Sequence, residues 1–301
     1  MIEESKYHKQ GSLFAFIAFF IWGIFPLYWQ FLLHVPLEDV LALRIIYLAV
    51  LMLLFIFWQK QSFSLISILQ NPKIFIRVLA STAMIGINWY IFMYIVMTGK
   101  TIQASLGYFI NPLINILLGI VFFKERLSSM QKIAAFCALV GVLPYLFNQE
   151  NLPIYAFLLA LSFAFYSLIR KSSPLNASLG LAAESSLLSI AIFIYFVLND
   201  YSEKFLQLSQ YDLNTHLFLI GGGIVTAVPL LLFIKAAQRI RLSSLGYFQY
   251  IAPTCQFVIA VFIFGEELNS KLVFCFVMTW LGLALIVSEQ YLKNWRKKAS
   301  H

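Results

Sequence analysis

The feature of this sequence that most restricts its fold is a series of ten apolar runs, each long enough to cross a lipid bilayer as a helix. A hydrocarbon core about 30 Å thick needs about 20 residues of α-helix. Polar breaks that contain turn-forming Asn, Ser and Pro residues separate many of the runs. We place the runs at residues 12–33, 39–58, 74–98, 103–123, 130–148, 152–171, 178–198, 214–237, 243–264 and 271–292. The pattern predicts an all-α polytopic membrane protein with ten transmembrane helices.

The composition excludes a water-soluble chain. Hydrophobic residues make up 61% of the 301 residues and charged residues 11%, whereas charged residues make up about 25% of a typical soluble protein. Most connections between the runs are short. Only 59–73 and 199–213 are long enough to hold an interfacial turn or a short helix. We therefore expect no soluble domain.

Basic residues predict how the helices are oriented. With the N-terminus inside, only Lys100, Lys204 and Lys271 of the 21 Lys and Arg residues fall on the outer side. This is the bias of the positive-inside rule, and it places the polar tails 1–10 and 293–301 in the cytoplasm. The formal charge of +8 is explained by topology, so we expect no nucleic-acid partner.

The sequence contains an internal repeat. Residues 105–109 and 244–248 both read Ser-Leu-Gly-Tyr-Phe. A proline follows each copy, and a glutamate lies thirteen residues beyond each proline: Pro112 and Glu125, then Pro253 and Glu266. We interpret the chain as a duplication with one five-helix repeat at 11–148 and a second at 149–292.

Five spans in each repeat would turn the second copy upside down in the membrane. Inverted repeats are typical of secondary transporters, which bind solute near the midplane between the copies and alternate access by rocking one copy against the other. We expect a cavity bounded by spans one to four and six to nine. Because proline removes a backbone donor, Pro112 and Pro253 are expected to kink the two matching helices.

Three stretches carry a family resemblance: Phe20–Gly23 in the first span, Ala104–Pro112 in the fourth and Gly246–Pro253 in the ninth. Together they resemble the drug/metabolite transporter superfamily, and more narrowly its EamA-type RarD branch, whose members are often labelled chloramphenicol-sensitivity proteins. The resemblance implies a ten-helix, multi-pass protein of the bacterial inner membrane that moves a small organic solute. It implies no particular substrate, since the superfamily handles amino acids, nucleotide sugars, amines and drugs.

Two ionisable residues lie clearly within the runs, Arg44 in the second and Glu184 in the seventh. A charge in hydrocarbon is costly, so each needs an explanation. Arg44 either binds a carboxylate or phosphate of the solute or reaches outward to Glu38 or Asp39. Glu184 is either a proton-coupling site or the partner of an ammonium group, or it bonds to neighbouring serines or to Arg170.

A second set of candidates is polar or aromatic without charge. Amide side chains in hydrocarbon bridge helices or face a cavity, and aromatic rings stack on a flat or cationic solute or pack in the core. Together with Arg44, the candidate substrate-binding residues are Trp22, Asn88, Trp89, Tyr108, Asn111, Tyr247, Gln249 and Tyr250.

An intramembrane enzyme is the rival class. The four His residues form no His-Glu-x-x-His pair, and the Asp residues lie at span ends or in loops, so we expect no catalytic residue, metal site or cofactor. A facilitative channel or uniporter is the alternative to a carrier. Small residues at Ala134, Ala138 and Gly282 make a homodimer possible. The sequence thus predicts a secondary transporter that exports a small organic solute, such as an amino acid-like metabolite or a drug, through the lipid bilayer.

Overall fold

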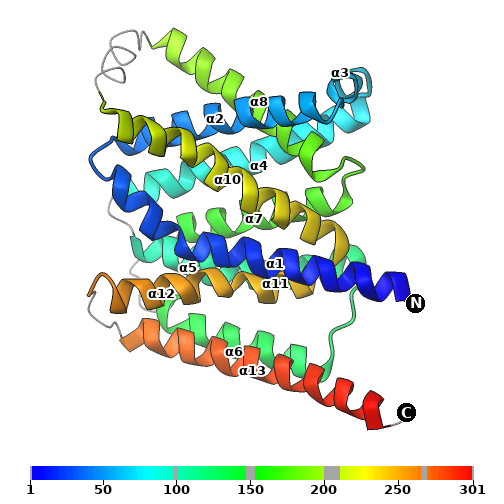
Figure 1. The fold of residues 1–301 in the computed structure, drawn as a ribbon. Helices are drawn as coiled ribbons and strands as arrows, with labels where there is room; N and C mark the ends of the chain where they lie inside the picture. The colour runs from blue at the N-terminus through cyan, green and yellow to red at the C-terminus, as the bar shows by residue number, and fades with distance from the viewer. Residues whose placement is uncertain (1, 98–100, 147–152, 200–210, 266–269, 300–301) are drawn as a thin grey trace.

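The computed structural model describes residues 2–97, 101–146, 153–199, 211–265 and 270–299. Throughout these residues the regular secondary structure is helical, and the helices lie side by side as a bundle (Figure 1). Both termini lie at the same end of the bundle, on the right in the view of Figure 1.

Each of the predicted apolar runs coincides with helical structure. The helices are α1 (Ile2–Trp29), the short 3₁₀ helix η1 (Gln30–Leu32), α2 (Leu37–Trp58), α3 (Ser62–Gln70), α4 (Pro72–Met97), α5 (Thr101–Phe123), α6 (Ser129–Leu146), α7 (Ile154–Ser172), α8 (Ala177–Leu198), α10 (Leu213–Arg239), α11 (Leu242–Gln249), α12 (Ile251–Phe262) and α13 (Ser270–Ala299). Among the described residues, eight helical segments are long and apolar enough to span a bilayer, while Ser129–Pro144 and Val273–Glu289 are shorter apolar segments. Helix α3 occupies the connection 59–73, as predicted.

The two repeat-related prolines affect their helices differently. Helix α5 continues through Pro112 as one element, and the kink at Pro112 stays a prediction. The ninth run is divided at Tyr250 into α11 and α12. Because Pro253 has no N–H, the carbonyl of Gln249 four residues earlier lacks its helical donor, and the Tyr250 N–H bonds to the Tyr247 carbonyl at 3.4 Å.

Helices from distant parts of the chain pack against each other. Helix α1 contacts α10 and α12, α7 contacts α4 and α5, α2 contacts α8, and α11 contacts α5. The approach of α11 to α5 requires a glycine, since a Cβ on Gly246 would lie 2.8 Å from the Pro112 carbonyl oxygen. The repeated glycine thus permits close helix contact.

Helices α6 and α13 form a separate pair at one edge of the bundle (Figure 1). A Cβ on Gly282 would lie 2.9 Å from the carbonyl oxygen of Ala134, and Ala134 and Ala138 are both buried. The small residues that suggested a homodimer are therefore used for packing within one chain. The homodimer remains an expectation, without that support.

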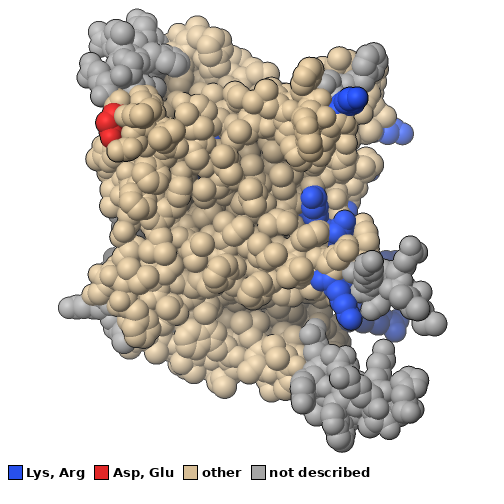
Figure 2. Space-filling model, in the orientation of Figure 1, with Lys and Arg blue, Asp and Glu red and all other residues tan. Residues whose placement is uncertain are grey.

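The surface fits a multi-pass membrane protein. Large apolar side chains are exposed on it, including Phe57 and Trp58 on α2 and Phe262 at the end of α12. In the face shown in Figure 2, Lys and Arg gather at the end that carries the termini, acidic residues appear at the other end, and the area between is uncharged. An apolar surface of this extent is stable in lipid rather than in water.

Candidate functional site: a central cavity

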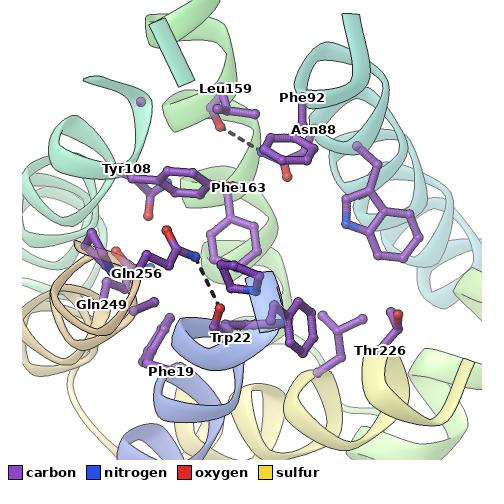
Figure 3. Close-up of a pocket in the computed structure, with 18 of the residues that line it drawn as sticks. Phe19, Trp22, Asn88, Phe92, Tyr108, Leu159, Phe163, Thr226, Gln249 and Gln256 are labelled. Carbon is purple, nitrogen blue, oxygen red and sulfur yellow. Dashed lines mark hydrogen bonds between the residues drawn. The ribbon is translucent and has the colours of Figure 1, made fainter. Parts of the chain in front are cut away.

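A cavity of about 460 Å³ lies inside the bundle between helices of both halves. Figure 3 shows most of the residues that line it. The lining residues come from α1, α2, α4, α5, α7, α10, α11 and α12; they are Phe19, Trp22, Phe25, Pro26, Trp29, Arg44, Asn88, Trp89, Phe92, Gly107, Tyr108, Asn111, Leu159, Phe163, Thr226, Leu230, Gln249, Ala252, Pro253 and Gln256. The predicted location is therefore nearly right. Helix α8, the seventh span, is the exception because it contributes none of these residues.

The wall formed by α1 is largely aromatic. Phe19, Trp22, Phe25 and Trp29 follow one another at intervals of three or four residues, which places them along one face of a helix. Trp22 contacts Phe163 of α7, with ring centroids 5.9 Å apart. Sequence reasoning selected only Trp22 from this group, although the helical spacing of the aromatic residues was a usable signal.

Arg44 of α2 brings a positive charge to the cavity. Its guanidinium carbon lies 4.9 Å from the ring centroid of Trp89 and 5.7 Å from that of Trp29, both within the range of cation–π attraction. Its Nε is buried and has no hydrogen-bond partner. Arg44 therefore faces the two tryptophans, and the alternative in which it reaches outward to Glu38 or Asp39 is not what the structure shows.

Two amide side chains are held with their oxygens available. The Asn88 amide nitrogen donates to the Leu159 carbonyl at 2.8 Å and to the Ser162 hydroxyl at 3.1 Å. The Gln256 amide nitrogen donates to the Trp22 carbonyl at 3.2 Å. These bonds, two of which are dashed in Figure 3, fix the nitrogens against the protein. The amide oxygens of Asn88 and Gln256 accept no hydrogen bond from the described residues.

The other amides at the cavity belong to a buried network between helices. Asn111 donates to the Ala160 carbonyl at 2.6 Å. Asn115 donates to the amide oxygens of Asn111 and Gln249, at 3.0 and 3.1 Å. This network joins α5, α7 and α11, and leaves the Gln249 amide nitrogen buried without a partner. Asn111 and Gln249 thus line the cavity and hold helices together.

The predicted tyrosines do not all reach the cavity. Tyr108 lines it, but Tyr247 and Tyr250 do not. The Tyr247 hydroxyl donates to the Gln131 carbonyl at 2.6 Å, and the Tyr250 hydroxyl donates to the Phe109 carbonyl at 3.3 Å. Both rings are buried between helices, because α11 presents Gln249 to the cavity and turns its neighbours away from it.

Glu184 also lies outside the cavity lining. Its carboxylate accepts hydrogen bonds from Ser81 at 2.6 Å and from Tyr166 at 3.1 Å, and Arg170 lies 3.5 Å away. Glu184 and Arg170 are each only 1% exposed. The structure therefore shows the alternative in which Glu184 bonds to serine and to Arg170. Arg170, which the charge count places on the cytoplasmic side, is buried in the last turn of α7.

At the end of the bundle that carries the termini, two charged side chains bond to the ends of helices. The Glu125 carboxylate accepts hydrogen bonds from the backbone N–H groups of Leu242 and Ser243, at 2.7 and 2.9 Å, and from the Ser243 hydroxyl at 2.5 Å. The Lys171 ammonium donates to the carbonyls of Ala237 and Ile240. An anion at the start of α11 and a cation at the end of α10 each complement a helix dipole.

Comparison with known proteins gives a consistent family assignment. A model of the EamA-like transporter family matches residues 9–147 and again residues 152–288. A protein named RarD from Escherichia coli K12 is 40% identical over 287 residues, which cover 95% of this chain and 96% of that protein. An uncharacterized transporter, YojE of Bacillus subtilis, is 37% identical, with 96% of each chain covered.

A solved crystal structure shares the fold. It superimposes with a TM-score of 0.67 over 91% of this chain and 96% of its own, at 16% sequence identity. At that identity the likeness concerns the arrangement of the helices and not the solute.

Proposed function

This chain belongs to the EamA-like transporter family and to its RarD branch, and on that premise we propose that it is a secondary transporter that exports a small organic solute across the bacterial inner membrane. Its family and its relatives support a membrane transporter of the drug/metabolite type. The observation that carries the proposal is the central cavity, which lies between helices of both halves and is lined by Arg44, aromatic rings and amides. The solute would be an amino acid-like metabolite or a drug.

The proposed mechanism is alternating access by two inverted five-helix repeats. The family model matches each half of the chain, which supports the duplication. Helix α1 packs on α12 and α10 as α7 packs on α5 and α4, which is the pairing expected from two copies of one unit. Glu125, which follows α5 in the first repeat, bonds to the start of α11. Helix α12, the matching helix of the second repeat, ends at the opposite end of the bundle (Figure 1). These features support inverted repeats, with ten membrane-spanning segments.

The proposed orientation has both termini in the cytoplasm. The termini lie at the right-hand end of the bundle in Figure 1, and Lys and Arg gather at the same end in Figure 2. Positive loops favour the cytoplasmic side. The hydrogen bonds of Glu125 to Leu242 and Ser243 lie at this end and join the two halves. Lys171 of the second half also contacts the ring of Phe123 in the first half, at 5.2 Å from the ring centroid. The cavity would open to the cytoplasm when these contacts separate.

We propose that the solute is held by the cavity-facing candidates Trp22, Arg44, Asn88, Trp89 and Tyr108. Asn111 and Gln249 would contribute while keeping α5, α7 and α11 in register. This division follows from the hydrogen bonds, since the amide oxygen of Asn88 is available and that of Asn111 accepts from Asn115.

Transport by purified protein in liposomes tests the proposal. A thermal-shift screen of amino acids, nucleosides, amines and antibiotics selects a solute, because a ligand that binds only the folded state raises the melting temperature. A carrier should saturate with that solute and show trans-stimulation. Trp89→Ala should reduce transport, whereas Trp58→Ala is the matched control because Trp58 is 77% exposed on the outer surface of α2.

Two outcomes would contradict the proposal. Single-channel currents without trans-stimulation would favour a channel. Equal loss of transport in Trp89→Ala and Trp58→Ala would show that the solute does not bind in the cavity. Proton coupling through Glu184 is tested separately with Glu184→Gln. Because Glu184 is buried outside the cavity, we expect the variant to keep the pH dependence of transport. A variant that lost this pH dependence would identify Glu184 as the proton-coupling residue.

A further inference from the structure

We propose that the cavity selects an aromatic carboxylate that carries an N–H or O–H donor, in preference to amines, zwitterions and neutral analogues. This inference rests on the proposed function, and it narrows the solute to a class of compounds. Three properties of the cavity lead to it: its charge, its aromatic walls and its two available amide oxygens.

The charge of the cavity favours an anion. Among the described residues that line it, Arg44 is the one cation, and none is Asp or Glu. Among the described residues, the guanidinium has aromatic neighbours and no ion-pair partner. A charged group in a low-dielectric site is most stable when it is paired. A carboxylate would supply that partner, whereas an amine would add a second positive charge.

The walls favour a flat apolar body. Eight of the twenty lining residues are aromatic. Aromatic pairs are most favourable in offset-stacked or edge-to-face contact, and rings from α1, α4, α5 and α7 surround the space from several directions (Figure 3). A planar ring system can make such contacts with several of them at once.

The amide oxygens favour a hydrogen-bond donor on the solute. The carbonyls of Leu159 and Trp22 hold the nitrogens of Asn88 and Gln256. Each amide is therefore fixed with its acceptor end available to the cavity (Figure 3). A bound solute that offered no donor would desolvate these oxygens without replacing their hydrogen bonds. An indole N–H or a phenolic O–H would satisfy one of them.

A series of four compounds that share one ring system and its N–H donor tests the preference for an anion. Indole-3-propionate is an anion, tryptophan a zwitterion, tryptamine a cation and indole-3-propionamide a neutral analogue. Isothermal titration of purified protein at pH 7 should give the tightest binding for indole-3-propionate, by at least tenfold over tryptamine and the amide. Arg44→Gln should weaken its binding at least tenfold, and Arg44→Lys should weaken it less. Arg77→Gln is the matched control, since Arg77 is exposed on α4, and should bind like the wild type.

The outcomes distinguish this inference from the proposed function. Tryptamine, tryptophan or the neutral amide binding as tightly as indole-3-propionate would overturn the selection for an anion, as would unchanged binding by a folded Arg44→Gln variant. If the protein transports another solute with trans-stimulation but binds none of the four compounds, the proposed carrier mechanism is kept and the proposed solute class is wrong. If no solute shows carrier kinetics while indole-3-propionate binds through Arg44, the site stands and the transport mechanism is wrong.

Discussion

Arg44 and Arg170 are two arginines enclosed by the same helix bundle, and the protein treats them in opposite ways. Arg170 pairs with Glu184 at 3.5 Å, donates to the carbonyl of Asn176 at 3.3 Å and is 1% exposed. Arg44 borders the cavity between two tryptophans and has no ion-pair partner among the described residues. The comparison teaches that a charge inside a membrane protein is explained by its neighbours. A charge that the chain itself satisfies supports the fold, and one that it leaves unsatisfied at a cavity is available to a ligand.

The largest expected effect comes from breaking the satisfied pair. Arg170→Met leaves the Glu184 carboxylate buried without its countercharge, and removal of one member of a buried pair costs about 3–5 kcal/mol. We expect a loss of that size in the free energy of unfolding, measured by denaturant titration in mixed micelles. Arg44→Met should leave this free energy nearly unchanged, because no ion pair is lost.

The double variant Arg170→Met with Glu184→Met sharpens this comparison. Replacing both members of a buried pair with apolar residues is often neutral or stabilising, so the second substitution should recover most of the stability lost in the first. Equal losses for Arg44→Met and Arg170→Met would show that the two arginines do not differ in the way described.

A smaller effect is expected at the end of the bundle, where Glu125 is paired with a helix terminus instead of an arginine. Its carboxylate accepts from two backbone N–H groups at the start of α11, and the loss of a capping side chain costs about 0.5–2 kcal/mol. Glu125→Ala should lower the free energy of unfolding by that amount, and Glu125→Gln by less because its amide keeps one acceptor. If Glu125→Ala is as costly as Arg170→Met, the contact acts as a buried ion and not as a cap.

The smallest effect is expected at Asp212, an exposed charge that precedes α10. Its carboxylate accepts hydrogen bonds from the hydroxyl and the backbone N–H of Thr215, which lower its pKa below the ordinary value, and nearby His34 lowers it further. A lowered carboxyl pKa contributes stability that is present above the ordinary value of about 3.9 and is lost as the pH falls through the folded-state value.

Unfolding of wild type and Asp212→Asn between pH 6 and pH 2 measures this contribution. The wild type should lose stability below about pH 4 more steeply than the variant, because Asn keeps the cap without titrating. Parallel curves for the two proteins would show that this carboxylate contributes nothing to the pH dependence.

Most of the fold could be predicted from the sequence, and the site only in part. Apolar length is a local property, so the helices fell near the expected boundaries. Which face of a helix meets the cavity depends on partners far along the chain. Tyr247 and Tyr250 flank Gln249 closely, yet only Gln249 lines the cavity. Arg170 lies near a predicted loop, and its guanidinium is buried against Glu184, Gly180 and the carbonyl of Asn176. The count of basic residues carries no information about these contacts.

The division of the ninth run at Tyr250 has a mechanical consequence. Helix α11 is held at its start by Glu125, while α12 packs on α1, so the two segments are attached to different parts of the protein. The helical hydrogen bond that would join the Gln249 carbonyl to position 253 is already absent, so bending there does not have to break it. If the two halves rock as proposed, α12 could move with α1 by bending at Tyr250 while α11 stays packed on α5. The two ends of the cavity could then open at different times.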